Sequence, residues 1–120
     1  MNKKVLIVED DTDFQDIYEL YLRGESYQVL RAGDGKQALD VLGKEMPDLI
    51  ILDLIMPVMD GEEFYVRLRA QEKWRHIPVI LASVNEKVPQ RIEELGGVTD
   101  ALKKPFDVEV LVQKIRNCLK

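Results

Sequence analysis

Four sets of polar side chains in this sequence could take part in chemistry, because each set follows a short apolar segment. The acids Glu9–Asp11 follow the first such segment, and Asp53 follows a later and more apolar one. Ser83 and Lys104 follow two further segments in the same way. If these segments are strands of one parallel sheet, their carboxyl ends share the edge where such sheets bind ligands. We therefore expect these side chains to gather at one site.

The acids would create an electrostatic problem at this edge. Neighbouring strands lie about 4.8 Å apart, so carboxylates that end adjacent strands repel each other by about 3 kcal/mol at an effective dielectric constant of about 20. Either raised pKa values or a bound cation would relieve this repulsion. Lys104 can neutralise only one charge. A magnesium ion suits a site made of a few carboxylates and waters, and it usually also binds a phosphate oxygen. The acids therefore favour phosphoryl chemistry.

Asp53 is the candidate nucleophile, since it stands alone at the end of the most apolar segment of the chain. A carboxylate can accept a phosphoryl group and form an acyl phosphate. The transferring group spreads its charge over equatorial oxygens, so the reaction needs mainly positioning and positive charge. We expect Mg²⁺ and the Lys104 ammonium to supply that charge. The Ser83 hydroxyl would donate a hydrogen bond to a phosphoryl oxygen.

The apolar pattern alternates between short unbroken runs and stretches with helical spacing. Unbroken runs of branched residues are typical of strands buried on both faces, whereas helical spacing is typical of amphipathic helices. Strand and helix alternate five times, which predicts an α/β fold with a parallel sheet covered by helices on both faces. The predicted strands are Val5–Val8, Tyr27–Leu30, Leu49–Leu52, Pro78–Ala82 and Ala101–Leu102.

A helical stretch follows each predicted strand. Asp11 or Thr12 is the expected N-cap of the first helix, and Asp60 and Asp107 are the expected caps of the third and fifth. Pro89 falls in the first turn of the fourth helix, which should therefore start late or bend. The apolar stripes are Phe14, Ile17, Tyr18 and Tyr21; Ala38, Val41 and Leu42; Phe64 and Leu68; Val88, Ile92 and Leu95; and Val108, Leu111, Val112, Ile115 and Leu119.

Composition excludes several classes of protein. The 120 residues are 46% hydrophobic, which excludes disordered and collagenous chains. The net charge of -5 disfavours direct contact with nucleic acid. Cys118 is the single cysteine, which indicates a reducing compartment, and no segment has the length of a signal peptide or membrane span. We expect one domain over residues 1–120, located in the cytoplasm, with His76 on its surface or in a loop.

Four motifs follow one another along the chain: Val5–Asp11, Pro47–Pro57 with Asp60–Gly61, Leu81–Ser83 and Lys104–Phe106. In this order they resemble those of one signalling family, the receiver domain of two-component response regulators. The resemblance runs from about Lys3 to the end of the chain, and it implies a flavodoxin-like (βα)5 fold. In that fold a doubly wound, five-stranded parallel sheet has the strand order 2-1-3-4-5.

The resemblance also implies a function. Asp53 would accept a phosphoryl group from a sensor histidine kinase or a phosphotransfer protein, and the domain would switch a downstream output domain or protein. No turnover of an external substrate is implied. Asp10, Asp53 and the backbone carbonyl of Ile55 would bind Mg²⁺ directly, with Glu9 acting largely through water. The implied phosphoryl contacts are Ser83 and Lys104.

Several positions depart from the family pattern. Ala101 stands where the family usually has Tyr or Phe, so a side-chain rotation cannot serve as the switch there. Val84 stands where Ala or Gly is favoured, and its branched side chain should narrow access to the phosphoryl group. Ile55 and Asn85 occupy positions that tune dephosphorylation in the family. We predict a phosphoryl group that is longer lived than in chemotaxis-type members.

Three other functions remain open on the sequence alone. An aspartyl-phosphate phosphatase needs an acid two residues after its nucleophile, where this chain has Ile55. An FMN carrier needs a phosphate loop rich in Ser, Thr and Gly, whereas the loop here is acidic. A pseudo-receiver that only binds proteins is the strongest alternative, because Ala101 and Val84 are altered.

Overall fold

Strands and helices alternate along the chain in the computed structural model, which describes residues 2–56, 58–84 and 87–119. The strands are β1 (Lys4–Val8), β2 (Gln28–Ala32), β3 (Leu49–Asp53), β4 (Val79–Ser83) and β5 (Val98–Lys103). The helices are α1 (Thr12–Gly24), α2 (Gly35–Leu42), α3 (Gly61–Ala70), α4 (Gln90–Leu95) and α5 (Val108–Cys118), and a short 3-10 helix, η1 (Glu72–Trp74), follows α3.

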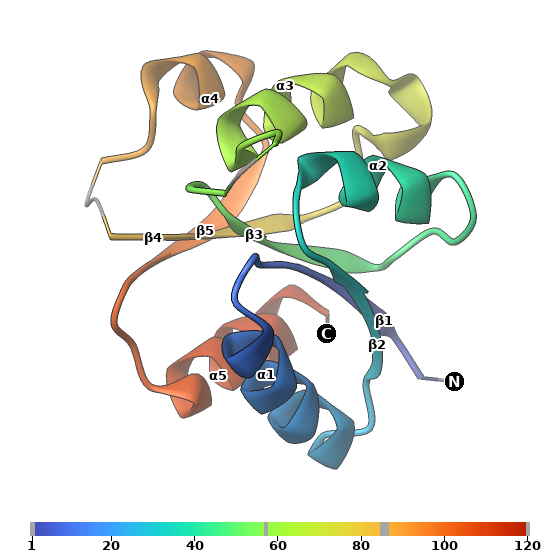
Figure 1. The fold of residues 1–120 in the computed structure, drawn as a ribbon, viewed down its shortest axis with the longest axis vertical. Helices are drawn as coiled ribbons and strands as arrows, with labels where there is room; N and C mark the ends of the chain where they lie inside the picture. Colours follow the sequence, from blue (N-terminus) through green and yellow to red (C-terminus); the bar gives the residue numbers. More distant parts are fainter. Residues whose placement is uncertain (1, 57, 85–86, 120) are drawn as a thin grey trace.

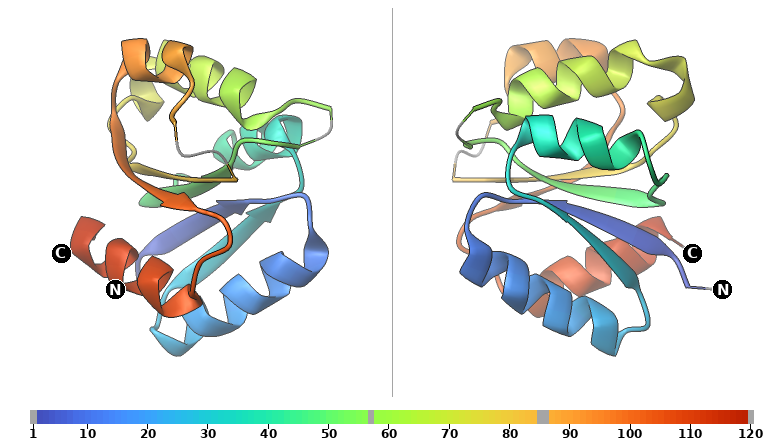
Figure 2. Two further views of the ribbon diagram at one scale, coloured as in Figure 1. Left: turned by 90° about the vertical axis from the view of Figure 1, so that its left-hand side faces the viewer. Right: turned by 45° about the vertical axis from the view of Figure 1, so that its right-hand side comes forward.

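The strands form one parallel sheet in the order β2-β1-β3-β4-β5, which confirms the predicted fold and strand order. Helices α1 and α5 cover one face of the sheet, and α2, α3 and α4 cover the other (Figures 1 and 2). The order of the connections reverses between β1 and β3, so the carboxyl ends of these two strands lie side by side. That is the place where a doubly wound sheet binds its ligands.

The core is divided into two layers by the alternation of side chains along each strand. Val5 and Ile7 pack in the layer under α1 and α5, whereas Leu6 and Val8 pack in the layer under α2, α3 and α4. The residues of β3 and β4 are all buried, and those of β1 are buried from Val5 onward. Burial on both faces explains why these strands have unbroken apolar sequences.

Aspartate side chains cap three of the helices. Asp11 accepts hydrogen bonds from the Asp13 and Phe14 amides, so it is the N-cap of α1. Asp34 and Asp60 cap α2 and α3 in the same way. Asp107 holds the N-cap position of α5 but makes no capping hydrogen bond with its side chain. The predicted position of the α5 N-cap is therefore correct, but the capping hydrogen bond expected from the Asp107 side chain does not form.

Helix α1 buries a different face from the predicted apolar stripe. Gln15, Tyr18 and Leu22 are its buried residues. Only Tyr18 belongs to the predicted stripe, and its other members are 42–47% exposed. The polar end of Gln15 can be buried because it finds backbone acceptors at the ends of β1 and β2. The half-exposed members of the stripe are Phe14, Ile17 and Tyr21.

Two elements near the C-terminus differ from the prediction. Strand β5 is an edge strand that begins at Val98, earlier than the predicted Ala101–Leu102, and its exposed and buried residues mostly alternate. Polar residues on its exposed side hid this strand from a search for unbroken apolar runs. Helix α4 begins at Gln90, so it starts late as expected, but Pro89 is its N-cap and not a residue of its first turn as predicted. Val88 of the predicted stripe therefore precedes the helix.

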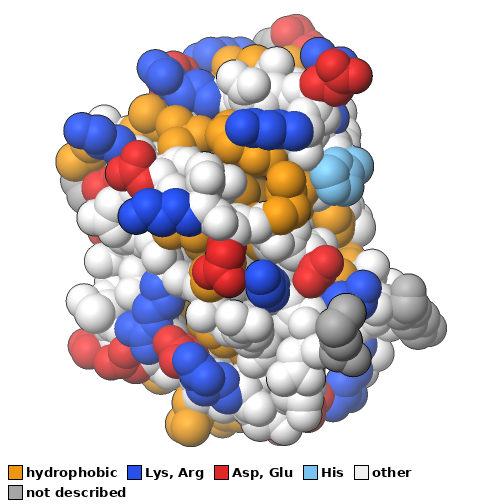
Figure 3. Space-filling model, turned by 90° about the vertical axis from the view of Figure 1, so that its right-hand side faces the viewer, with side chains coloured by type: hydrophobic (Ala, Val, Ile, Leu, Met, Phe, Trp, Pro, Cys, Tyr) orange, Lys and Arg blue, Asp and Glu red, His pale blue; other side chains and the backbone are white. Residues whose placement is uncertain are grey.

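No helix in the described part of the chain has both the length and the apolar character that are needed to cross a bilayer. His76 is exposed in the segment between η1 and β4, as predicted. A histidine side chain is visible at the surface in Figure 3, with hydrophobic and basic side chains on the same face.

Candidate functional site

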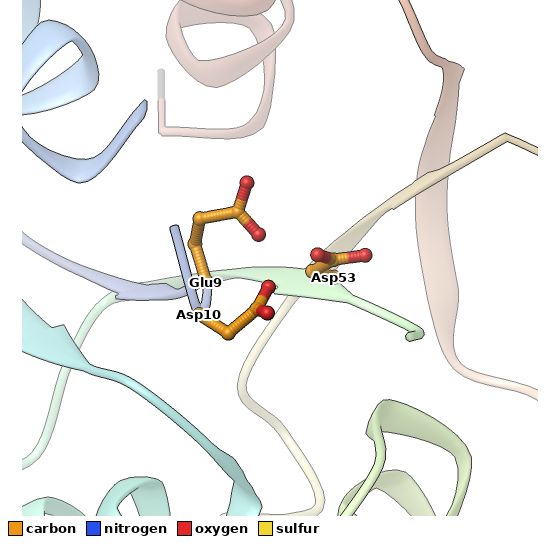
Figure 4. Close-up of side chains that lie close together, drawn as sticks. All are labelled: Glu9, Asp10 and Asp53. Carbon is orange, nitrogen blue, oxygen red and sulfur yellow. The ribbon is translucent and has the colours of Figure 1, made fainter. Parts of the chain in front are cut away.

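Three carboxyl groups meet at the carboxyl ends of β1 and β3. Glu9 and Asp10 follow β1 directly, and Asp53 is the last residue of β3. The parallel register aligns Val8 with Leu52, which brings the residues after them together. A carboxylate oxygen from each acid lies within 4.8 Å of the others. Figure 4 shows the carboxyl groups of Glu9 and Asp10 directed toward Asp53. The structure thus places these predicted site residues in one cluster.

Lys104 joins this cluster from the end of β5. Its Nζ atom lies 3.1 Å from Glu9 Oε1 and 3.1 Å from Asp53 Oδ2. The Lys104 side chain is 20% exposed, whereas the neighbouring Lys103 is an exposed residue of β5. Of the two adjacent lysines, it is therefore Lys104 that reaches the carboxylates, as expected. One ammonium group contacts two acids, which the sequence did not indicate.

Burial and the neighbouring Asp53 change the protonation of Glu9. Burial, followed by the hydrogen bond and the charge of Asp53, raises the pKa of Glu9 to about 8, although Lys104 acts in the opposite direction. Burial by itself lowers the pKa of Lys104, but the charges of Asp53 and Glu9 raise it overall. The sequence predicted that either a raised pKa or a bound cation would relieve the repulsion between the acids. The raised pKa of Glu9 corresponds to the first of these.

Asp53 is held from two sides. The Ile55 amide donates a hydrogen bond of 3.2 Å to Asp53 Oδ1, so one oxygen faces the backbone and the other faces Lys104. Helix α3 also packs closely against the end of β3, because a Cβ atom at Gly61 would lie 2.2 Å from the carbonyl oxygen of Asp53. The Gly61 amide donates to the carbonyl oxygen of Leu54 at 2.9 Å. Only glycine permits this approach.

Ser83 ends β4, one residue beyond the register partner of Asp53, which is Ala82. Ser83 is 6% exposed, and its carbonyl oxygen accepts a 2.7 Å hydrogen bond from the Lys104 amide. This bond links the ends of β4 and β5, so Ser83 and Lys104 are positioned together. Val84, the next residue, is 55% exposed. Asn85, which we expected to tune dephosphorylation, lies outside the described residues.

Ala101 is exposed on the edge strand β5, although its register partner in β4, Leu81, is buried. It lines a hollow of about 280 Å³ together with Ser83, Val88 and other residues of β4 and β5. Ala101 and Ser83 thus border the same hollow.

Sequence analysis missed an aromatic column beside the carboxylates. The ring of Tyr18 stacks on Phe14 at 6.2 Å and on Phe106 at 6.0 Å, measured between ring centroids. The ammonium of Lys104 lies 5.8 Å from the centroid of the Phe14 ring. These rings line a groove of about 340 Å³ that also includes Ile17 and Val84. The aromatic types were visible in the sequence, but their stacking across α1 and the β5–α5 connection was not.

The donor set of the cluster fits a hard divalent cation. All three candidate side-chain ligands are carboxylates, which Mg²⁺ prefers to nitrogen or sulfur ligands. Lys104 supplies one positive charge for three carboxyl groups. In the metal-free protein the raised pKa of Glu9 reduces the repulsion between these groups. A bound divalent cation would reduce the same repulsion while all three groups are ionised. Glu9, Asp10 and Asp53 could therefore bind a metal ion.

Comparison with known families accounts for this arrangement of acids and lysine. The family model of the response regulator receiver domain matches residues 5–116 of the chain. The chain belongs to this family. The receiver domain is 34% identical over 119 residues to sporulation initiation phosphotransferase F of Bacillus subtilis, a match that covers 99% of this chain and 95% of that protein. Several further curated relatives are longer, and the chain spans between 26% and 52% of their length.

Solved receiver structures are similar over nearly the whole chain. The chemotaxis response regulator CheY4 of Vibrio cholerae is 31% identical, has a TM-score of 0.90, and is matched over 98% of this chain and 99% of that one. The receiver domain of sensor histidine kinase PA1611 from Pseudomonas aeruginosa is 30% identical, has a TM-score of 0.87, and is matched over 99% and 98%. In that structure a magnesium ion is coordinated in the active site cleft.

Proposed function

We propose that this receiver domain is a phosphoacceptor, in which Asp53 accepts a phosphoryl group from the phosphohistidine of a sensor histidine kinase or a phosphotransfer protein. The observation that carries the proposal is the position of Asp53. Its carboxylate is almost fully buried, lies among two further acids, and has the Lys104 ammonium 3.1 Å from one oxygen. The family to which the chain belongs supports the same function.

In the reaction, a carboxylate oxygen of Asp53 forms a bond to phosphorus, and the bond between phosphorus and the donor's imidazole nitrogen breaks. The other ring nitrogen of the donor imidazole carries a proton, so the ring keeps the electron pair of the broken bond and leaves as the neutral base. Negative charge remains on the phosphoryl oxygens, where Lys104 can form a charge-assisted hydrogen bond. Ser83 would donate its hydroxyl to a second phosphoryl oxygen. The product is an aspartyl phosphate on Asp53.

Glu9, Asp10 and Asp53 would hold Mg²⁺, with the backbone carbonyl of Ile55 as a further ligand and Glu9 acting largely through water. Bound Mg²⁺ would neutralise part of the charge on the acids and on the phosphoryl group. The chain's own groups orient the acceptor: the Ile55 amide fixes Asp53 Oδ1, and the close packing of Gly61 fixes the backbone of Asp53. This combination supplies the positioning and positive charge that phosphoryl transfer needs.

The surface around Asp53 suits docking of a protein donor. Phe14 and Ile17 are 46% and 42% exposed on α1, and Val84 is 55% exposed on the other side of the groove beside Lys104. Exposed aromatic and aliphatic side chains such as these are typical of the apolar core of a protein interface, which becomes buried when the partner binds. We propose that the donor packs here, and that residues 1–120 act in the cytoplasm as one domain that signals to an output domain or protein without turning over an external substrate.

Acetyl phosphate with intact-mass spectrometry tests this function, because it supplies the phosphoryl group without a kinase. We expect the wild-type protein to gain the mass of one phosphoryl group in the presence of MgCl₂ and to lose this gain in EDTA. Asp53→Asn should abolish the gain, whereas Asp40→Asn, at an exposed position of α2, should leave it unchanged. A folded wild-type protein that gains no mass with MgCl₂ would instead be a pseudo-receiver that only binds proteins.

A further inference from the structure

Gln15 is a buried polar residue that none of the roles described above uses. It lies on α1, is 7% exposed, and directs its amide toward the carboxyl ends of β1 and β2. The Nε2 group donates hydrogen bonds to the carbonyl oxygen of Glu9 and, at 3.3 Å, to the carbonyl oxygen of Ala32. The side chain therefore connects α1 to the residue at which the acidic cluster begins.

The orientation of the Gln15 amide is set by Arg31 on β2. The NH1 group of Arg31 lies 3.5 Å from Gln15 Oε1, so the amide oxygen faces a cation. Arg31 is itself fixed on α1 by Asp16 at 2.7 Å and by Glu19 at 2.5 Å. If the amide turned over, its NH₂ group would face the guanidinium and its oxygen would face two carbonyl oxygens. Only the observed orientation satisfies both ends of the amide.

This contact restrains the peptide that leads from Glu9 to Asp10. The Glu9 amide donates to the carbonyl oxygen of Ala32 at 3.0 Å, and the Glu9 carbonyl accepts from Gln15. Both backbone polar groups of Glu9 are thus hydrogen-bonded, which limits rotation of the turn that presents the two acids. Asp10 is exposed, so its carboxylate depends on this turn for its direction toward Asp53 (Figure 4).

We propose that Gln15, oriented by Arg31, is a positioning residue for the metal site: it holds the Glu9–Asp10 turn so that the Glu9 and Asp10 carboxylates face Asp53. This inference rests on the proposed function, in which these carboxylates bind Mg²⁺. Groups that orient metal ligands typically change metal affinity by about 10–100-fold when they are removed. Gln15 touches neither the metal nor the phosphoryl group, and it acts through the backbone of Glu9.

The test compares Gln15→Met, which keeps the length of the side chain but removes its hydrogen bonds, with Leu22→Val. Leu22 is buried on the same helix, and its substitution weakens helix packing without removing a hydrogen bond. Titration of MgCl₂ by calorimetry should show binding about 10-fold weaker for Gln15→Met and unchanged within about twofold for Leu22→Val. Arg31→Met, which removes the orienting cation, should weaken binding by a smaller factor.

A second measurement does not depend on the metal. In EDTA, hydrogen exchange of the Glu9 amide, corrected for the global stability of each variant, should be faster in Gln15→Met and unchanged in Leu22→Val. Equal Mg²⁺ affinity of Gln15→Met and wild type, or an equal loss in Leu22→Val, would overturn the positioning role. A wild-type protein that binds no Mg²⁺ would contradict the proposed function, and unchanged exchange at Glu9 in Gln15→Met would separately contradict the restraint by Gln15.

Discussion

The ammonium nitrogen of Lys104 lies 3.1 Å from Oδ2 of Asp53, although Asp53 ends β3 and Lys104 follows β5, two strands that are not adjacent in the sheet. The same nitrogen lies 3.1 Å from Glu9 Oε1. In the absence of a metal ion, Lys104 is therefore the cation that holds the carboxylates of β1 and β3 together. Its removal would leave the Asp53 carboxylate without its paired cation in a largely buried position.

We predict that Lys104→Met lowers the free energy of unfolding in EDTA by about 1–3 kcal/mol, less than for a fully buried pair because the side chain is partly exposed. Addition of MgCl₂ should raise the melting temperature of this variant more than that of wild type, since the metal then replaces the lost charge. Urea and thermal unfolding measure both effects. Lys36→Met, at an exposed position of α2, is the control. Unchanged stability of Lys104→Met in EDTA would refute the role of the lysine.

The raised pKa of Glu9 predicts a pH dependence of stability in the metal-free protein. The folded protein keeps a proton on Glu9 up to about pH 8, whereas the unfolded chain releases it near the ordinary value of 4.5. The contribution of Glu9 to stability is thus complete below about pH 4.5 and is lost as the pH rises toward 8. Glu9→Gln removes this loss, because glutamine stays neutral.

Urea unfolding of wild type and Glu9→Gln in EDTA, from pH 5 to 8.5, checks this prediction. The quantity to compare is the difference in the free energy of unfolding between the two proteins at each pH. The stability of Glu9→Gln relative to wild type should increase with pH, by on the order of 3 kcal/mol across the range. The same variant should bind Mg²⁺ more weakly, since it has lost a carboxylate. A difference that stays constant with pH would show that Glu9 titrates normally.

Gly61→Ala should destabilise the protein and disturb the site together. The added Cβ atom would lie 2.2 Å from the carbonyl oxygen of Asp53 and 2.6 Å from Leu54 Cα, so the backbone of β3 or α3 must shift. Such overpacking costs about 1–3 kcal/mol, and Mg²⁺ binding should also weaken because Asp53 moves. The matched control is Gly24→Ala, where no atom lies within 4 Å of the added Cβ. Equal effects of the two substitutions on stability and on calorimetric Mg²⁺ affinity would rule out this close approach.

The aspartyl phosphate should persist for minutes or longer in the presence of Mg²⁺. Val84 and Ile55 are 55% and 61% exposed, and both follow strands that end at the site. Their apolar side chains should limit the approach of water to the phosphoryl group. The decay of the phosphorylated mass after removal of acetyl phosphate measures the lifetime. Val84→Ala should shorten it several-fold, whereas Val110→Ala on the exposed surface of α5 should not. A wild-type half-life of seconds would count against this prediction.

The sheet and the location of the site were predictable from sequence because they depend on short-range patterns. Val5–Val8 and Leu49–Asp53 each combine an unbroken apolar run with an acid at or just after the end, and the structure places these acids together. Parallel strands bring their carboxyl ends to one edge whatever lies between them. The roles of Asp53, Ser83 and Lys104 in phosphoryl transfer stay predictions until phosphorylation is measured.

The parts that could not be predicted depend on contacts between distant segments. Gln15 is buried because its side-chain amide donates hydrogen bonds to carbonyl groups at the ends of β1 and β2. Phe14, on the same helix, cannot form such bonds and is half exposed. Arg69 is likewise buried through hydrogen bonds to carbonyl oxygens, including those of Ile77 and Gly97. A sequence pattern that scores polar residues as exposed cannot find such residues, because their partners lie elsewhere in the chain.

A crystal structure of the protein grown with millimolar MnCl₂ tests the central claim most directly, because Mn²⁺ substitutes for Mg²⁺ and gives an anomalous signal. We predict one anomalous peak among the acids at the ends of β1 and β3, about 2.1 Å from oxygens of Asp10 and Asp53 and from the Ile55 carbonyl. The Lys104 ammonium should then remain near Asp53. Contradiction would come from a map with no peak there, or from Glu9, Asp10 and Asp53 turned apart into solvent.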